Sequence, residues 1–335
     1  MAASDWVLLS LAPAPAERVE GWFDGIDGLS IRLPTDRTAD AVRASIGEAD
    51  IVLSDWSSTL RVDATDVAAA GRLAFLMSPS VGIDSLDLEA LTAAGVVVAN
   101  TAGLNAPSVA EWCLAAAFAV ARSVVWVDRQ VRDGGWPQLE LPERGSTELA
   151  GMRVGVLGFG AVGSRVARLF GAIGCDVAYW TRRRRASDEE AGATWLPLDD
   201  LVERSDILVD NLSLTPETRA LLDAERLAAL PRGAIVIDAG RGGIVDHVAL
   251  LAAIETGALR GAAIDVFERE PLPLDSPLRR SDRILLSSHA ASATPQALAR
   301  VFRRVSENVR RAIAGEPVES VVNGLDPVIR RRMPR

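Results

Sequence analysis

The stretch Val154-Gly155-Val156-Leu157-Gly158-Phe159-Gly160-Ala161-Val162-Gly163 decides the fold of this chain of 335 residues. It places the spacing G-x-G-x-x-G directly after an apolar segment and directly before the helical pattern Ser164 to Ile173. In such a unit Gly158 makes the tight turn, Gly160 lets the backbone approach a pyrophosphate, and Gly163 allows close packing of helix on strand. A glycine turn that only connects strand to helix is the alternative, which the βαβ pattern that follows disfavours. The stretch therefore predicts a dinucleotide-binding domain.

Short aliphatic runs alternate with helical patterns along the whole chain, which is typical of parallel sheets wound with helices. We expect two such windings, and the second contains six strands, the strand count of a complete dinucleotide-binding domain. The expected strands are Trp6–Ser10, Ile51–Leu53, Leu73–Met77 and Val96–Ala99, then Arg153–Leu157, Val177–Trp180, Ile207–Asn211, Ile235–Asp238, Ala262–Val266 and Ile284–Ser287. The pattern predicts an α/β protein with two doubly wound parallel-sheet domains.

Between the two windings, Ala106 to Val127 predicts one long helix, because a cap candidate and an early proline precede an alanine-rich apolar body. The segment Arg129 to Thr147 lacks periodicity and is expected to be an exposed loop or arm. A last amphipathic helix is expected from Pro295 to about Gly315.

The composition excludes several classes of function. The net charge is −9 and basic residues form only short runs, such as Arg182 to Arg185, which argues against a nucleic-acid partner. The chain contains no lysine, so all 36 basic residues are arginines and Schiff-base chemistry is excluded. It contains only two histidines, His247 and His289, so metal sites built from several histidines are excluded and no metal is expected.

The same sequence favours a reducing, cytoplasmic location. The two cysteines, Cys113 and Cys175, lie in apolar segments without the spacing of a disulfide framework. The N-terminus lacks the basic and apolar regions of a signal peptide. No uncharged apolar run approaches the ~18 residues of a membrane span, so no membrane partner is expected.

The end of the second strand of the dinucleotide domain bears on the choice of cofactor. About 20 residues after the glycines, NAD-specific sites place a carboxylate that binds the ribose 2′-hydroxyl. Here the chain has Thr181, Arg182 and Arg183, which can hydrogen-bond and neutralise a 2′-phosphate. We therefore expect NADP to be preferred over NAD, with a solvated basic turn as the alternative.

Four ordered motifs then suggest a family. They are Asn211 to Thr218, Ile237 to Asp246, Gly261 to Pro271 and Ser288-His289, with further landmarks at Val81 to Asp84, Gly103 to Asn105 and Ala110-Glu111. Together they resemble the D-isomer-specific 2-hydroxyacid dehydrogenase family, which includes phosphoglycerate and D-lactate dehydrogenases and glyoxylate/hydroxypyruvate reductases. The resemblance covers nearly the whole chain.

The resemblance implies catalytic roles for three residues and a cofactor role for a fourth. Arg241 would bind the substrate carboxylate and carbonyl, His289 would be the general acid/base, and Glu270 would pair with His289. Asp265 would contact the nicotinamide side. These residue types suit the chemistry, because imidazole can give and take the proton that accompanies hydride transfer, and the arginine fork matches a carboxylate.

The resemblance also implies binding residues. Backbone N–H groups of the loop Ser80-Val81-Gly82 would hold the substrate carboxylate, and glycine suits that close approach. Phe159, Val162, Ser213 and Thr218 would line the cofactor by their positions.

The chain departs from the commonest family pattern at three positions. Asn211 and Ser213 stand where histidine and proline are frequent, and Asp238 stands where asparagine is usual. The serine resembles the glyoxylate/hydroxypyruvate branch. His247 follows Asp246 at the expected start of a helix, where Asp246 can cap, so we assign His247 a structural role.

We therefore expect a Rossmann dinucleotide-binding domain of residues 102–290 inserted into a flavodoxin-like substrate domain of residues 1–101 and 291–335. The expected function is NAD(P)H-dependent reduction of a small 2-keto acid, such as glyoxylate or hydroxypyruvate, to the D-hydroxy acid, by a homodimer. A formate- or phosphite-type dehydrogenase is one alternative, which Glu270 disfavours because the formate-type site has glutamine there. A dinucleotide-sensing regulator or corepressor-like protein on the same scaffold is another.

Overall fold

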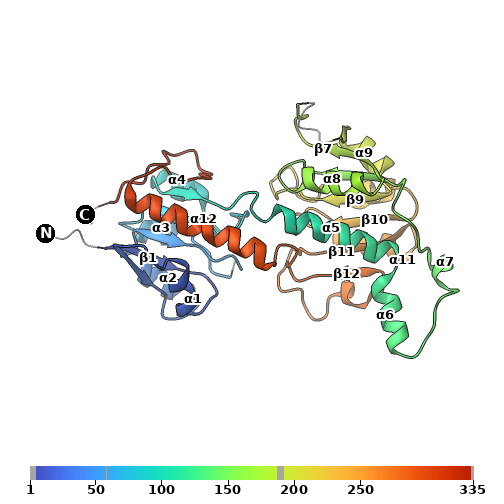
Figure 1. Ribbon diagram of the computed structural model, residues 1–335, viewed down its shortest axis with the longest axis horizontal. Coiled ribbons are helices and arrows are strands. Elements are labelled where there is room, and N and C mark those ends of the chain that lie inside the picture. The colour runs from blue at the N-terminus through green and yellow to red at the C-terminus, as the bar shows by residue number, and fades with distance from the viewer. Residues whose placement is uncertain (1–4, 58, 187–191, 333–335) are drawn as a thin grey trace. The chain divides into compact units, whose positions relative to one another are not determined.

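The computed structural model describes residues 5–57, 59–186 and 192–332. The chain divides into two compact units, which we call unit 1 (Met1–Asn105 and Pro295–Arg335) and unit 2 (Ala106–Thr294). Each unit contains one parallel sheet with helices on it (Figure 1). Unit 1 is therefore discontinuous in sequence, with unit 2 inserted between its parts.

Unit 1 has a five-stranded sheet in the order β2-β1-β3-β4-β5, which is the flavodoxin-like order. All four strand pairs are parallel. Its elements are β1 (Trp6–Ser10), α1 (Ala16–Trp22), β2 (Leu29–Arg32), α2 (Ala39–Ile46), β3 (Ile51–Leu53), α3 (Ala64–Ala69), β4 (Phe75–Met77), α4 (Leu88–Ala93), β5 (Val97–Ala99) and α12 (Pro295–Ala314). The predicted fold class is confirmed, but the sequence analysis missed β2, a partly buried edge strand that pairs only with β1.

Two hydrophobic clusters cover the two faces of this sheet. Side chains of α1 and α12 pack on one face, and side chains of α2, α3 and α4 pack on the other. In α12 the buried residues Val301, Val305, Val309 and Ala312 recur at helical spacing and form the stripe that faces the sheet. The C-terminal helix, distant in sequence, is therefore part of the unit 1 core, as Figure 1 shows.

Unit 2 has a seven-stranded parallel sheet in the order β12-β11-β10-β9-β6-β7-β8. Reading from β8 to β11 gives the Rossmann order, and β12 extends it by one strand. The elements are α5 (Ala106–Ala121), α6 (Val124–Arg132), α7 (Leu141–Arg144), β6 (Arg153–Leu157), α8 (Gly163–Ala172), β7 (Asp176–Trp180), β8 (Thr194–Trp195), α9 (Leu198–Arg204), β9 (Ile207–Asp210), α10 (Ala224–Ala229), β10 (Ala234–Asp238), α11 (His247–Glu255), β11 (Leu259–Ile264), the 3₁₀ helix η2 (Pro277–Arg280) and β12 (Ile284–Leu286). The sequence analysis missed β8, because two residues are too few to show a period.

The sheet of unit 2 is covered on both faces. Helices α5 and α8 pack on one face, while α9, α10 and α11 pack on the other. All residues of β9 and β10 are buried, which explains why these strands are continuous apolar runs in the sequence instead of alternating ones. Polar side chains of these two strands occur only at their carboxyl ends, Asp210 and Asp238.

The prediction of one helix from Ala106 to Val127 is wrong. Helix α5 ends at Ala121, Ser123 adopts the left-handed conformation (φ 51°), and α6 begins at Val124 with a bend of 59°. The left-handed residue breaks the hydrogen-bond ladder, so half-buried α5 stays on the sheet while α6, which has no buried residue, leaves it. The expected loop that follows also contains the short helix α7.

Among the described residues, no single helix is long and apolar enough to cross a membrane. The bent pair α5 and α6 passes the same test of length and composition when the two are taken together.

The glycine of α8 that lies against the sheet gives a stability prediction. A Cβ on Gly163 would overlap the carbonyl group of Gly158, whereas a Cβ on Gly171, in the same helix, would meet nothing within 4 Å. We expect Gly163→Ala to lower the free energy of unfolding by about 1–3 kcal/mol, because the turn must move. The matched control Gly171→Ala should raise it by up to about 1 kcal/mol through helix propensity. Urea unfolding of both variants measures this, and an equal effect of the two substitutions would contradict the close approach.

Candidate active site

The candidate residues of unit 2 gather at the carboxyl ends of its parallel strands, the edge where open α/β sheets bind ligands. Gly158 follows β6, Thr181 follows β7, Asp238 ends β10 and Asp265 follows β11. Because the strands are parallel, residues distant in sequence reach the same edge of the sheet.

The glycine turn has the shape that a dinucleotide pyrophosphate requires. Gly158 adopts φ +85°, and a Cβ there would lie 3.0 Å from the carbonyl oxygen of Asn211. Gly160 is exposed and has no atom near its Cβ position, so a ligand can approach its backbone. Among the described residues, the N–H groups of residues 159–163 have no hydrogen-bond acceptor, and they stand at the N-terminus of α8. These free donors and the helix dipole fit a bound pyrophosphate.

Phe159 lies in this turn, but its side chain points into the protein. It is 3% exposed and stacks on Tyr179, with 3.9 Å between the ring centroids. The backbone of Phe159 is therefore the part of this residue that can line a cofactor. Val162 is partly buried at the N-cap of α8.

The basic turn after β7 is open to solvent. Arg182 and Arg183 are exposed, and the hydroxyl of Thr181 donates to the carbonyl of Arg183 at 2.6 Å, which shapes the turn. The Arg182 cation also acts on the neighbouring loop after β9. The pKa of Glu217 is lowered chiefly by a hydrogen bond from Thr215, and the charge of Arg182 adds to that effect.

The loop after β9 carries Ser213 and Thr218. Ser213 is exposed, whereas Thr218 is 6% exposed. The Thr218 hydroxyl donates to the carbonyl of Ser213 at 2.7 Å and accepts from the N–H of Thr215 at 2.7 Å. Thr218 thus holds the shape of the loop, while the side chain of Ser213 is exposed and can contact a ligand.

His289 and Glu270 lie in direct contact. The Nδ1 of His289 is 2.9 Å from one carboxylate oxygen of Glu270, and the N–H of Phe267 donates to the other oxygen at 2.9 Å. Both side chains remain partly open to solvent, with exposures of 46% and 37%. The contact leaves the Nε2 atom of the imidazole as the nitrogen that can face a substrate.

The backbone of His289 is held in an unfavourable conformation. It adopts φ 55°, which is uncommon for residues other than glycine. Its N–H donates to the carbonyl of Asp265 at 2.8 Å, and the Asp265 carboxylate accepts the N–H groups of Ala290 at 2.7 Å and Ala291 at 3.0 Å. Asp265 is 2% exposed, and its carboxylate anchors the loop that carries His289. The sequence analysis missed this role, because a buried loop anchor leaves no periodic signal.

The electrostatics of this cluster favour a charged Glu270. Burial raises the pKa of its carboxyl group, but hydrogen bonds from His289 and the Phe267 N–H, with the charges of His289 and Arg241, outweigh burial and lower the pKa. Glu270 is therefore a carboxylate at neutral pH, beside the imidazole and within the field of Arg241.

Arg241 stands in the turn after β10. Its Nη1 donates to the carbonyl of Gly240 at 2.8 Å, and its side chain is partly exposed. The next residue, Gly242, packs so closely on the loop after β11 that a Cβ would overlap the backbone of Phe267. The turns that carry Arg241 and Glu270 are thus joined at Phe267, which donates to Glu270.

The loop Ser80-Val81-Gly82 lies in unit 1, after β4. The hydroxyl of Ser80 donates to the carbonyl of Gly82 at 2.7 Å, and Asn100 donates to the carbonyl of Val81 at 2.8 Å. Among the described residues, the N–H groups of Val81 and Gly82 have no acceptor. The Ser80 N–H donates to the hydroxyl of Ser78 at 3.4 Å, so the N–H groups of Val81 and Gly82 are the ones in this loop that remain able to bind an anion.

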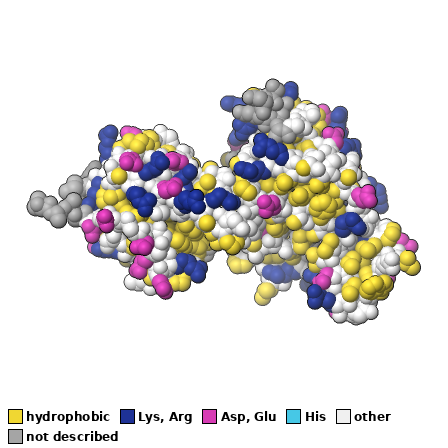
Figure 2. Space-filling view, viewed as in Figure 1, with side chains coloured by type: hydrophobic (Ala, Val, Ile, Leu, Met, Phe, Trp, Pro, Cys, Tyr) yellow, Lys and Arg dark blue, Asp and Glu magenta, His cyan; other side chains and the backbone are white. Residues whose placement is uncertain are grey.

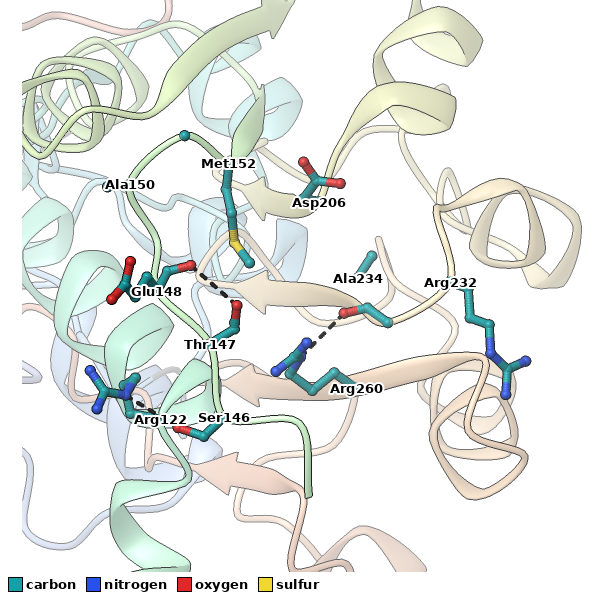
Figure 3. A pocket seen from close by; sticks show the side chains of 12 residues that line it. Arg122, Ser146, Thr147, Glu148, Ala150, Met152, Asp206, Arg232, Ala234 and Arg260 are labelled. Atoms are coloured by element: carbon teal, nitrogen blue, oxygen red, sulfur yellow. Dashed lines mark hydrogen bonds between the residues drawn. The ribbon is translucent and has the colours of Figure 1, made fainter. Parts of the chain in front are cut away.

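A cavity of about 800 Å³ lies elsewhere, at the amino ends of the strands of unit 2 (Figure 3). Met152, Asp206 and Ala234, which stand at the starts of β6, β9 and β10, line it together with Arg122, Thr147 and Arg260. None of the candidate catalytic residues reaches this end of the sheet, so this cavity is not the candidate active site.

Comparisons with known proteins agree with this arrangement. Residues 114–291 match the family described as D-isomer specific 2-hydroxyacid dehydrogenase, NAD binding domain. The chain is 37% identical over 96% of its length to a D-3-phosphoglycerate dehydrogenase of Mycobacterium tuberculosis, but it spans only 58% of that relative. It is 38% identical to a glyoxylate reductase of Aeropyrum pernix, over 79% of this chain and 81% of the relative.

A solved structure has the same fold. The chain superimposes on D-mandelate dehydrogenase from Rhodotorula graminis with a TM-score of 0.86, at 21% identity, over 99% of this chain and 100% of the other. The family match, the extent of the sequence identity and the shared fold lead to one conclusion: the chain belongs to the D-isomer specific 2-hydroxyacid dehydrogenase family.

Proposed function

We propose that this protein reduces a small 2-keto acid, such as glyoxylate or hydroxypyruvate, to the D-2-hydroxy acid with a nicotinamide dinucleotide. The observation that carries the proposal is the contact of His289 with the Glu270 carboxylate beside Arg241. Those three side chains supply a proton donor, a group that stabilises its charged form and a cation for a carboxylate. Glyoxylate reductases and phosphoglycerate dehydrogenases among the relatives support the substrate class.

Each of these residues has a separate role in the proposed reduction. The dinucleotide, when bound at the turn of Gly158 to Gly163, supplies the hydride. The guanidinium of Arg241 binds the substrate carboxylate and polarises the C2 carbonyl. The imidazolium of His289 gives its proton to the carbonyl oxygen, and Glu270 keeps the ring oriented for that transfer. The N–H groups of Ser80-Val81-Gly82 are proposed to bind the carboxylate as well.

Two alternative functions, a formate- or phosphite-type dehydrogenase and a dinucleotide-sensing regulator, are distinguished from keto-acid reduction by different observations. Formate or phosphite oxidation needs no proton donor for a carbonyl oxygen, and the Glu270–His289 pair is suited to that donation. A dinucleotide-sensing regulator could retain the same residues, so turnover decides between regulator and enzyme.

A panel of 2-keto acids, tested with NADPH and NADH, measures the proposed activity. We expect turnover of a small 2-keto acid and none with formate or phosphite. Arg241→Ala should lower kcat/KM about 10²-fold or more while cofactor binding, followed by fluorescence, changes little, because the anchor acts on substrate alone. Dinucleotide binding without turnover of any acid would favour the regulator.

We propose that NADP is the preferred cofactor, because Thr181, Arg182 and Arg183 end β7 without a carboxylate at the ribose position. Replacing Arg182 and Arg183 together with alanine should raise the KM for NADPH about tenfold or more and that for NADH much less, since only NADPH carries the 2′-phosphate. The matched control is the double alanine variant of Arg303 and Arg310, exposed arginines of α12, which removes the same charge. An equal effect on both cofactors would contradict the preference.

We propose further that the protein is a homodimer in the cytoplasm. Large apolar side chains between residues 118 and 139 of unit 2 are exposed, including Val124 at 51%, Trp136 at 79% and Leu139 at 87%. Figure 2 shows hydrophobic side chains gathered over α6 on the visible face. Such a patch is typical of an association surface, and sedimentation as a monomer at micromolar concentration would remove this proposal.

The pair of Glu270 and His289 gives a prediction on pH dependence. Glu270→Gln keeps the shape but loses the negative charge that stabilises the imidazolium. Reduction requires imidazolium, so its rate should begin to fall at lower pH in the variant, while oxidation, which requires neutral imidazole, should become active at lower pH. His289→Ala should depress both directions by about 10²–10⁴-fold.

The matched control is Glu268→Gln, two residues away and largely exposed, which removes the same charge without touching His289. Its pH–rate profiles should follow those of the wild type. Profiles of Glu270→Gln that do the same would mean that Glu270 has only a structural role.

A further inference from the structure

Two carboxyl groups are buried together behind the turn that carries Arg241. Asp210 ends β9 and Asp238 ends β10, and the two residues are register partners in the parallel sheet. Both are 0% exposed. Two ionised carboxylates so close and so far from water would repel strongly, so the structure must neutralise at least one of them.

The hydrogen bonds of the pair leave one position for a proton. The Oδ2 of Asp238 lies 2.8 Å from the Nε2 of His247, and the Oδ1 of Asp210 accepts the N–H of Leu212 at 3.0 Å. The remaining oxygens, Asp210 Oδ2 and Asp238 Oδ1, are buried and have no donor among the described residues. One proton held between the two carboxyl groups would satisfy both oxygens.

The electrostatics indicate which residue holds this proton. Burial raises the pKa of Asp210 well above its ordinary value, and the neighbouring charge of Asp238 raises it further. Burial also raises the pKa of Asp238, but the hydrogen bond and charge of His247 oppose that effect. Asp210 is therefore the member of the pair that favours the proton, which it would donate to Asp238.

Other titratable groups face the pair from the elements packed on it. The Arg241 cation lowers the pKa of Asp210, in opposition to burial. The pKa of Cys113, on α5, is raised by burial and then by the negative charge of Asp265 and of the Asp210–Asp238 pair, which keeps this thiol neutral. His247 and Arg241 are thus the basic groups that oppose the effect of burial on the pair.

The pair is connected to Arg241 through the backbone. The N–H of Ala239 donates to the carbonyl of Asp210 at 3.1 Å. Gly240 lies so close to Asp210 that a Cβ would overlap its carboxyl group, and the Gly240 backbone also lowers the pKa of Asp238. The carbonyl of Gly240 in turn accepts the Nη1 of Arg241 at 2.8 Å. A change in the pair therefore reaches the guanidinium within two residues.

We propose that Asp210 and Asp238, joined by one shared proton and held by His247, are positioning residues that set the turn of Gly240 and Arg241 for binding of the substrate carboxylate. This inference rests on the proposed function, since it assigns Arg241 to that carboxylate. His247, which the sequence analysis assigned a structural role, is part of the same hydrogen-bonded group as Asp210 and Asp238. Loss of the shared proton would leave two buried carboxylates in repulsion and would displace the turn.

The first experiment compares substrate binding in two variants of Asp210. An asparagine side chain at this position cannot lose a proton and can donate an amide N–H to Asp238. In Asp210→Asn the KM for the keto acid should therefore stay within about threefold of wild type near neutral pH. In the same variant, any rise of this KM at alkaline pH that the wild type shows should disappear. Asp210→Ala removes the donor and should raise the KM for the keto acid about tenfold, with the KM for the cofactor unchanged.

The matched control is Asp206→Ala, because Asp206 precedes the same strand and pairs with Arg153 at the opposite end. It should lower the melting temperature without raising the KM for the keto acid. If Asp210→Ala behaves like Asp206→Ala, with stability reduced and this KM unchanged, the pair is only structural and the proposal is overturned.

The second experiment tests the shared proton without any turnover. The pKa of Asp210 is raised in the folded protein above its ordinary value of 3.8, so the folded state binds a proton that the unfolded state has released. The free energy of unfolding should therefore fall as pH rises from about 4 through the raised pKa. Asp210→Asn should lack this part of the decline. Its melting temperature should therefore increase relative to that of the wild type as pH rises. Parallel melting curves for the two proteins would overturn the shared proton.

The two experiments also separate the inference from the proposed function. A wild type that reduces no keto acid, combined with diverging melting curves, would refute the proposed function and with it the positioning role, while the shared proton would stand. Turnover with parallel melting curves would refute the inference alone.

Discussion

The parallel sheet of unit 2 is covered by helices on both faces, and this burial constrains where its polar chemistry can lie. Strands such as β9 and β10 have no exposed residue, so a polar side chain within them would need a partner in the interior. Functional groups are therefore displaced to the strand ends and the turns that follow. Since all strands run the same way, the carboxyl ends collect glycine N–H groups, an arginine, an imidazole and several carboxylates at one edge.

The turns at that edge depend on one another more than on the sheet. The Asp265 carboxylate holds the backbone after His289, Phe267 donates to Glu270, and Gly242 packs on Phe267. A left-handed His289 would relax if these contacts were absent, because its conformation costs free energy of order 1 kcal/mol or more. The network thus uses buried hydrogen bonds to hold partly exposed groups in fixed positions, which proton transfer to a substrate requires.

The charges of the site are balanced within short distances. The pKa of Glu270 is lowered by His289, the Phe267 N–H and Arg241, whereas the pKa of the more deeply buried Asp210 is raised by burial and by Asp238. The pKa values of these two carboxyl groups therefore shift in opposite directions because their solvation differs, although the charge of Arg241 acts on both. Burial likewise raises the pKa of Cys113, which stays a neutral thiol.

Local sequence patterns were sufficient for the two parallel sheets, the glycine turn and the final helix, because hydrophobic period and glycine spacing act over a few residues. They also singled out Arg241, Glu270 and His289, through ordered motifs. The same patterns missed the edge strand β2 and the short strand β8, and they did not show the break at Ser123, since a left-handed residue leaves no mark on an apolar period.

What only the tertiary structure decided are the contacts between residues distant in sequence. Asp210 and Asp238 become neighbours because β9 pairs with β10, and His247 reaches them because α11 packs beside that edge. The inward direction of Phe159 and the anchoring role of Asp265 likewise follow from packing. Sequence alone determined which chemical groups the chain carries and at which strand ends they stand, whereas folding decided which of them are desolvated together, and desolvation sets their charge.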